Sequence, residues 1–315
     1  MGRPLRIEYS GAYYHVTSRG NEKKDVFRSQ KDREKFLSYL ESATERYGAA
    51  VHAYCLMSNH YHLLMETPEG NLSQIMRHIN GAYTNYFNTK RQRAGHLFQG
   101  RYKAILVEKD AYALELSRYI HLNPVRAGMV QMPGEYRWSS YRSYIGQTAR
   151  PEWLKITDQL GQFSGAEKEK QDSYRHFVEA IIGEDEQNPL AAALGTAILG
   201  SHEFIAEIEE RHLAEKQADP DIPDMRKITC RWSLEEIVET VKAATKQENR
   251  LAKKLSIYLC HRYSGARLKE IGNLFGICAA GVSQESRRFA VRIQEDSELK
   301  KIVDGLRERI KYVNV

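Results

Sequence analysis

The chain has 315 residues, a formal charge of +6 and a pI of about 8.9. Its 42% hydrophobic and 28% charged residues are typical of globular proteins and exclude wholesale disorder. No apolar run is long enough to span a bilayer, and the N-terminus has no apolar signal-peptide core, so we expect a cytoplasmic protein without membrane segments. The four cysteines form no CxxC pair, which argues against a zinc knuckle or a thioredoxin-type site. The modest positive charge permits a nucleic-acid partner without requiring one.

Residues 1–146 alternate between strand-like and helix-like patterns. In chain order, we predict a strand at 13–17, a helix at 32–47, strands at 49–56 and 61–65, a helix at 73–88, a strand at 102–107 and a helix from 110 to about 122. Asp110 is expected to cap the last helix, which should stop before Pro124 because the residue preceding a proline avoids helical conformation. This β-α-β-β-α-β-α order predicts an α+β domain of the ferredoxin-like (split βαβ) type, with an antiparallel sheet and one added helix.

The remainder of the chain is less regular at first and then helical. Residues 147–224 are predicted to form a helical connector that ends in an acidic, proline-containing linker at 219–224. Residues 225–315 have helical periodicity and predict an all-α domain, in which Ser233 and Glu236 fit a capping box. A helix at 268–275, a turn at Gly276 and a helix at 280–294 predict a helix-turn-helix unit.

The strongest local signal is the pair His60 and His62. Side chains alternate faces along a strand, so the two imidazoles point the same way and can bind one divalent metal. The alternative is two half-exposed histidines on a sheet, which is the commoner situation because HxH pairs often arise by chance.

A tyrosine and an asparagine on the helix from residue 110 are candidates to complete a site. Tyr119 and Asn123 are four residues apart and therefore share one helix face, with a hydroxyl and an amide oxygen directed to the same region. The alternative for Tyr119 is a core position, since Tyr112, Leu116 and Tyr119 form a stripe at helical spacing.

Four blocks of the first half resemble, in the right order, the REP-associated tyrosine transposase family of single-tyrosine HUH transposases. The blocks are MSNHYHLL at 57–64, FQGRYK at 98–103, RYIHLNPVRAGMV at 118–130 and WSSY at 138–141. The resemblance implies that His60, His62 and Asn123 bind Mg or Mn and that Tyr119 is the nucleophile. Two nitrogen ligands favour Mn on softness.

The same resemblance implies an enzyme that nicks and rejoins single-stranded DNA near hairpins, as in REP-like palindromes, through a 5′-phosphotyrosine intermediate. A tyrosine hydroxyl is a weak nucleophile at neutral pH, so a metal on the scissile phosphate is needed to neutralise and orient it. Two alternatives stay open: a non-catalytic regulator that binds hairpin DNA or RNA, and a metal hydrolase that uses water. A homodimer is also compatible with the sequence, in which Tyr119 serves its own active site or its neighbour's.

Basic and aromatic residues precede the tyrosine helix. The basic residues could contact DNA phosphates, or they form an ordinary solvated loop; they are Lys90, Arg91, Arg93, Arg101 and Lys103. The aromatic residues could stack on unpaired bases, or they belong to the core; they are Tyr83, Tyr86, Phe87 and Phe98.

Residues 251–292 resemble the DNA-binding helices of the replication initiator DnaA. Val282, Phe289 and Ile293 are expected to pack inward, and three residues of the same helix could face DNA; these are Ser283, Arg287 and Arg288. The helix begins with Cys-Ala-Ala-Gly at 278–281, which offers few groups to read base edges, so phosphate contact is better supported than base readout. The alternative is a helical bundle that mediates protein contact.

Overall fold

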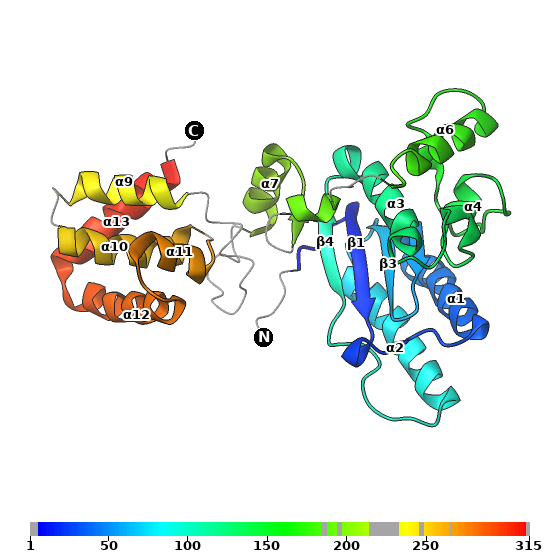
Figure 1. The fold of residues 1–315 in the computed structure, drawn as a ribbon, viewed down its shortest axis with the longest axis horizontal. Coiled ribbons are helices and arrows are strands. Elements are labelled where there is room, and N and C mark those ends of the chain that lie inside the picture. Colours follow the sequence, from blue (N-terminus) through cyan, green and yellow to red (C-terminus); the bar gives the residue numbers. More distant parts are fainter. Residues whose placement is uncertain are drawn as a thin grey trace. The chain divides into compact units, whose positions relative to one another are not determined.

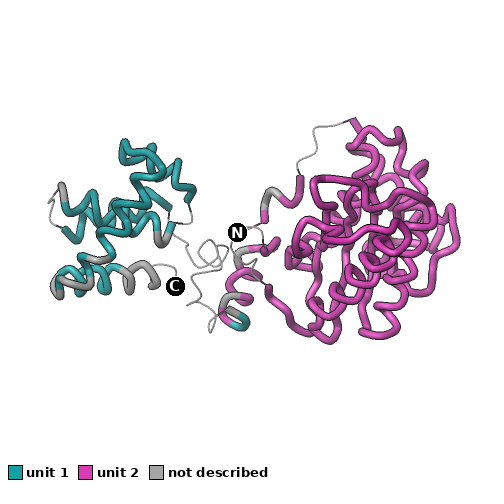
Figure 2. The backbone as a smooth tube through the Cα atoms, turned by 90° about the horizontal axis from the view of Figure 1, so that it is seen from below, with its two compact units in different colours: residues 1–5, 211–315 teal, residues 6–210 magenta. Residues whose placement is uncertain are grey.

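The computed structural model describes residues 6–183, 188–193, 197–213, 233–245, 249–264 and 266–312. The chain divides into two compact units, one of residues 6–210 and one made mainly of residues 211–315 (Figure 2). The predicted linker at 219–224 lies outside the described residues. No helix among the described ones is both long and apolar enough to cross a membrane.

The first unit is built on a five-stranded sheet with the order β2-β3-β1-β4-β5. Figure 1 shows β1 between β4 and β3. The strands are β1 (Ala12–Arg19), β2 (Ala50–Leu56), β3 (His60–Thr67), β4 (Lys103–Val107) and β5 (Ile198–Leu199). Neighbouring strands are antiparallel except for β5, which pairs parallel with β4. The four strands within residues 1–146 are antiparallel, as predicted. The parallel strand β5 was not predicted: it comes from the connector and, at two residues, is too short to show a strand pattern in the sequence.

Helices cover both faces of the sheet (Figure 1). On one face lie α1 (Gln30–Tyr47) and α2 (Leu72–Lys90), and on the other lies α3 (Lys109–Arg126). Tyr61 of β3 packs against Phe36 of α1, and its hydroxyl donates to Asn80 of α2. Leu64, whose side chain points to the opposite face of β3, packs in the same hydrophobic cluster as residues of α3. The alternation of strand side chains therefore separates the core under α1 and α2 from the histidine face under α3.

Several predicted helix boundaries differ in the structure, among them those of α1 and α3. Helix α1 begins at Gln30, because Ser29 and Asp32 form a reciprocal capping box. Helix α3 continues through Pro124, contrary to the prediction. Asp110 is not its cap either: Glu108 holds that position, and the Glu108 carboxylate accepts hydrogen bonds from Ser201 instead of capping the helix.

Short helices of the connector brace α3. The central contact is the buried Tyr174 of α6 (Glu167–Glu179), whose hydroxyl lies 2.8 Å from both Ser117 Oγ and His121 Nδ1 on α3. The other short helices of this unit are α4 (Tyr141–Tyr144), α5 (Thr157–Leu160) and α7 (His202–Ile208). It also has three 3₁₀ turns, which are η1 (Asn21–Lys23), η2 (Pro133–Glu135) and η3 (Pro189–Ala192). The π-helical turn η4 (Glu209–Leu213) spans the division between the two units at residue 210.

The described residues of the second unit form five helices around one apolar cluster. They are α9 (Leu234–Ala244), α10 (Asn249–Tyr263), α11 (Leu268–Phe275), α12 (Ala279–Glu295) and α13 (Ser297–Tyr312). The capping box of Ser233 and Glu236 and the bounds of α11 are confirmed. Gly276 ends α11 in the left-handed conformation, with φ of 68°.

Two glycines of this unit differ in how closely the chain approaches them. A Cβ atom on Gly272 would lie 2.4 Å from the Ile277 carbonyl oxygen, whereas one on Gly281 would make ordinary contacts at 3.6 Å. We therefore expect Gly272→Ala to destabilise α11 and α12 by about 2 kcal/mol, and Gly281→Ala to be neutral or stabilising by up to about 1 kcal/mol. Hydrogen exchange of peptides from these two helices measures the difference. Equal protection in the two variants would contradict the close approach at Gly272.

Candidate active site

His60 and His62 lie on the same face of β3, as the alternation of side chains predicts. Their ring centroids are 5.0 Å apart. His62 is 7% exposed, and His60 is half-buried with its Nδ1 atom 2.6 Å from Asn59 Oδ1. The pair therefore lies at the N-terminal end of β3, with the His60 ring near solvent and the His62 ring beneath α3.

A third histidine, which sequence reasoning missed, completes the cluster. His15 Nε2 lies 2.9 Å from His62 Nδ1, and the two rings stack with centroids 5.2 Å apart. His15 is on β1, where it faces Leu64 in the register and is the diagonal neighbour of His62. The signal was present in the sequence, because the predicted topology makes the first and third strands neighbours and His15 falls in the predicted strand at 13–17.

Burial keeps these histidines neutral at physiological pH. It lowers the pKa of His15 to about 4. The pKa of His60 also falls to about 4, from burial and then from the charge of Arg19. Burial, followed by the proximity of His15 and His60, lowers the pKa of His62 well below its usual value. When Nδ1 of His62 donates its hydrogen to His15, the Nε2 lone pair of His62 is left free to bind a cation, the arrangement typical of metal-binding histidines.

Tyr119 of α3 packs edge-on against this cluster. Its ring centroid lies 6.0 Å from that of His62 and 6.2 Å from that of His15. The side chain is half-buried, and the Arg126 guanidinium carbon lies 4.5 Å from its ring centroid. Burial raises the pKa of Tyr119, and the charge of Arg126 opposes that rise. The phenol is therefore neither sealed in the core nor free in solvent.

Asn123 and Arg126 both bind the backbone next to the phenol. Asn123 Nδ2 donates to the carbonyl oxygen of Tyr119 at 2.8 Å, and Arg126 Nη1 donates to the same oxygen at 3.0 Å. Pro124 lacks the N–H that would bind the Ile120 carbonyl oxygen, and these two side-chain donors bind the adjacent Tyr119 carbonyl oxygen in the same turn. The bond also fixes the amide nitrogen of Asn123 and leaves its oxygen as an acceptor.

These donors suit a divalent cation. Two neutral imidazoles come from one strand face, one of them held by His15, and the amide oxygen of Asn123 comes from the helix that carries Tyr119. Nitrogen and oxygen donors of this kind fit Mn²⁺, and Mg²⁺ less well.

The predicted basic residues occupy different environments. Lys90 and Arg91 both form ion pairs with the fully buried carboxylate of Asp32. Burial would raise the pKa of Asp32, but hydrogen bonds from Lys90 and Arg91 lower it to about 2. Arg93 is exposed and donates to the His96 carbonyl oxygen. Lys90 and Arg91 therefore anchor α2 to the start of α1, a contact that the sequence pattern did not reveal.

Arg101 and Lys103 are exposed at the start of β4. Arg101 lines a hollow of about 470 Å³ beside α2, together with Arg6, Arg77 and His96. The base-stacking interpretation is wrong for three of the aromatic residues, because Tyr83, Phe87 and Phe98 are buried in the core.

On α12, Val282 and Phe289 are buried in the apolar cluster, as predicted, and Ile293 packs against it. The opposite side carries the three residues expected to face DNA: Ser283 is half-buried, and Arg287 and Arg288 are exposed. Arg288 Nη1 lies 3.6 Å from Glu285 Oε1 of the preceding turn and forms an ion pair with it.

Comparisons with known proteins find similarity to part of this chain. Residues 8–123 match the family model described as "Transposase IS200 like". A Haemophilus influenzae protein described as a REP-associated tyrosine transposase is 27% identical over 128 residues, which are 37% of this chain and 73% of that protein. The solved structure of a REP-associated tyrosine transposase bound to a REP hairpin matches with a TM-score of 0.41 and 17% identity, covering 50% of this chain and 94% of that one. A Deinococcus radiodurans protein described as a transposase matches with a TM-score of 0.27 and 18% identity, covering 38% of this chain and 94% of that one.

Proposed function

We propose, on the premise that residues 8–123 belong to the IS200-like transposase family, that this protein nicks and transfers single-stranded DNA through a 5′-phosphotyrosine on Tyr119. The observation that carries the proposal is the edge-on contact of Tyr119 with His62, one of two neutral, same-facing imidazoles. The name of the Haemophilus influenzae relative supports a substrate of the REP type, single-stranded DNA beside a folded hairpin.

Each step of the proposed strand cleavage can be assigned to named residues of the chain. A divalent cation held by His60, His62 and Asn123 would neutralise the scissile phosphate. The Tyr119 oxygen attacks phosphorus in line, the phenol proton is lost to water, and the P–O3′ bond breaks. The leaving 3′ oxygen takes up a proton, and the 5′ end stays on Tyr119. Reversal with another 3′-hydroxyl rejoins strands without a further energy source. Arg126, beside the phenol ring, favours the phenolate as it forms.

The finer points of architecture belong to the same proposal. The strand order β2-β3-β1-β4 with α1 and α2 on one face supports the ferredoxin-like arrangement over residues 1–146. We further propose that 147–224 is a connector and that 225–315 binds DNA through α11 and α12 as a helix-turn-helix. The exposed Arg287 and Arg288 support phosphate contact there.

One experiment separates this function from its alternatives. The full-length protein is incubated with Mn²⁺ and a labelled single-stranded oligonucleotide that flanks a hairpin. A protein–DNA adduct that survives denaturant supports the phosphotyrosine mechanism. Cleavage without an adduct would identify a metal hydrolase, and binding without cleavage would identify a regulator.

The basic hollow beside α2 gives a prediction for DNA affinity. Arg101→Gln should weaken binding of single-stranded DNA several-fold and reduce the salt dependence by about one charge, because one phosphate contact is lost. Lys168→Gln on α6 is the matched control: it removes the same charge from a residue whose side chain is 68% exposed and pairs only with Asp172 among the ion pairs described. Titrations at several salt concentrations measure both variants, and equal effects would exclude the hollow as a DNA contact.

A further inference from the structure

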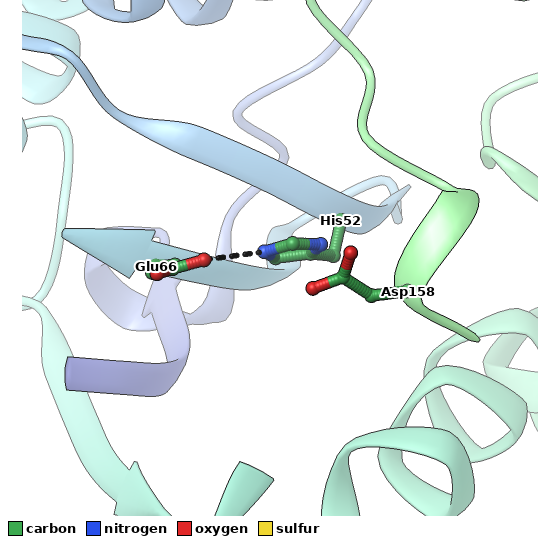
Figure 3. A group of neighbouring side chains, drawn as sticks. All are labelled: His52, Glu66 and Asp158. Atoms are coloured by element: carbon green, nitrogen blue, oxygen red, sulfur yellow. Dashed lines mark ion pairs between the residues drawn. The ribbon is translucent and has the colours of Figure 1, made fainter. Parts of the chain in front are cut away.

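A second cluster of metal-ligating side chains lies at the other end of β3. It consists of His52 on β2, Glu66 on β3 and Asp158 on α5, and one ligand atom from each lies within 4.8 Å of the others (Figure 3). Glu66 is four residues after His62 on the same strand face, on the order of 13 Å along the strand. The cluster is therefore separate from the His60 and His62 pair.

The imidazole of His52 lacks a hydrogen-bond partner at the atom that faces the cluster. The side chain is 2% exposed. Its Nδ1 atom lies 3.0 Å from the Lys155 carbonyl oxygen, which can only accept, so Nδ1 carries hydrogen. In the neutral ring, Nε2 then carries a lone pair and no hydrogen. Nε2 makes no hydrogen bond, yet it lies 3.5 Å from Glu66 Oε2. A lone pair directed at a carboxylate is unfavourable unless a cation or a proton lies between them.

An irregularity of the sheet aims His52 into this position. The register between β2 and β3 shifts between Val51 and Ala53, so His52 is an extra residue in its strand. The shift turns its ring onto Tyr13, with centroids 4.8 Å apart and planes at 22°. Such bulges bend a strand and redirect one side chain, and they are frequent beside functional sites.

Two carboxylates and one lysine meet at this cluster. Lys109 Nζ lies 2.7 Å from Asp158 Oδ2, and the Tyr13 hydroxyl donates to the same oxygen at 2.8 Å. The hydrogen bond from Lys109 lowers the pKa of Asp158, and the closeness of His52 lowers the pKa of Glu66. Both carboxylates are therefore ionised at neutral pH, and the one charge of Lys109 offsets only one of their two negative charges.

We propose that His52, Glu66 and Asp158 form a second divalent-cation site of the Zn²⁺ type. One imidazole nitrogen and two carboxylate oxygens supply three protein ligands, and a water takes the fourth position of a tetrahedral site, in which neighbouring ligand atoms lie about 3.4 Å apart. The His52–Glu66 separation of 3.5 Å already matches this spacing. A small movement of the half-exposed Asp158 carboxylate closes the set.

The site would cross-link segments that are distant in sequence. Asp158 lies in the connector, whose backbone runs along β2: Leu154 bridges with Val51, and the Lys155 amide donates to the Val51 carbonyl oxygen at 2.8 Å. A cation here therefore joins the connector to β2 and β3 and stabilises the folded first unit by binding it and not the unfolded chain.

The test removes the first metal site and asks whether a second remains. Chelator-stripped full-length protein with His60→Ala and His62→Ala is titrated with Zn²⁺ in competition with a chromogenic chelator, and Co²⁺ absorption reports a tetrahedral site. We expect one tight equivalent and a rise in Tm with Zn²⁺. Adding Glu66→Gln or Asp158→Asn should weaken that equivalent at least about tenfold. Glu69→Gln, an exposed glutamate three residues after Glu66, is the control and should leave it unchanged.

Each outcome decides the proposal. The proposal is supported if Glu66→Gln and Asp158→Asn reduce Zn²⁺ binding and Glu69→Gln does not. No tight Zn²⁺ equivalent in the His60→Ala, His62→Ala protein overturns it, and so does binding that survives both Glu66→Gln and Asp158→Asn. Circular dichroism of the metal-free variants confirms that they are folded. Because the titration contains no DNA, its result is independent of whether Tyr119 forms an adduct.

Discussion

Replacing Tyr119 with phenylalanine should reduce nicking of a hairpin-flanked single strand by at least about three orders of magnitude, while DNA binding stays nearly unchanged. The substitution removes only the hydroxyl. The ring that packs edge-on against His15 and His62 and lies under Arg126 is retained, so the local structure should persist. Cleavage rates and filter-binding affinities of the same preparations measure the two effects separately.

Tyr112→Phe is the matched control for this experiment. Tyr112 lies seven residues earlier on α3, is half-buried and packs against the same apolar cluster as Tyr119. Its hydroxyl has no role in the proposed reaction, so nicking should stay within about threefold of wild type. Comparable losses in the two variants would show that α3 is merely sensitive to tyrosine substitution.

His62→Ala should abolish metal-dependent cleavage. It removes the more buried of the two candidate ligands and leaves His60 and Asn123, too few donors to hold a divalent ion at micromolar concentrations. We expect a loss of cleavage similar to that of Tyr119→Phe, accompanied by loss of Mn²⁺ affinity in a titration without DNA. Normal Mn²⁺ binding by this variant would place the ion elsewhere.

His15→Phe should give an intermediate result. Phenylalanine fills the buried space of His15 but cannot accept a hydrogen bond from Nδ1 of His62. His62 then loses the partner that orients its ring, so Mn²⁺ affinity should fall about 10- to 100-fold and saturating Mn²⁺ should restore cleavage. Rescue of this kind distinguishes a positioning residue from a ligand, and failure of saturating Mn²⁺ to restore cleavage would contradict this role.

Local patterns predicted the part of the structure that depends on neighbouring residues. Period-2 alternation placed His60 and His62 on one face and Tyr61 on the other, and helical spacing placed Tyr119 on α3. The capping box at Ser233 and the helix at 268–275 followed from residues within a few positions of each other.

The features missed depend on contacts between distant segments. His15 joins His62 only because β1 lies beside β3, and Asp32 binds Lys90 and Arg91 across about 58 residues of chain. The strand β5 exists because β4 offers a free edge to two apolar residues of the connector. Helix α3 also continues through Pro124, which the local rule for the residue before a proline did not anticipate.

The most direct measurement of the central claim is mass spectrometry of the protein after reaction with a hairpin-flanked single strand and Mn²⁺. We expect one peptide, which contains Tyr119, to be heavier by a 5′-phosphorylated nucleotide after nuclease trimming. Cleaved DNA with an unmodified Tyr119 peptide, or a nucleotide attached to a different side chain, would contradict it.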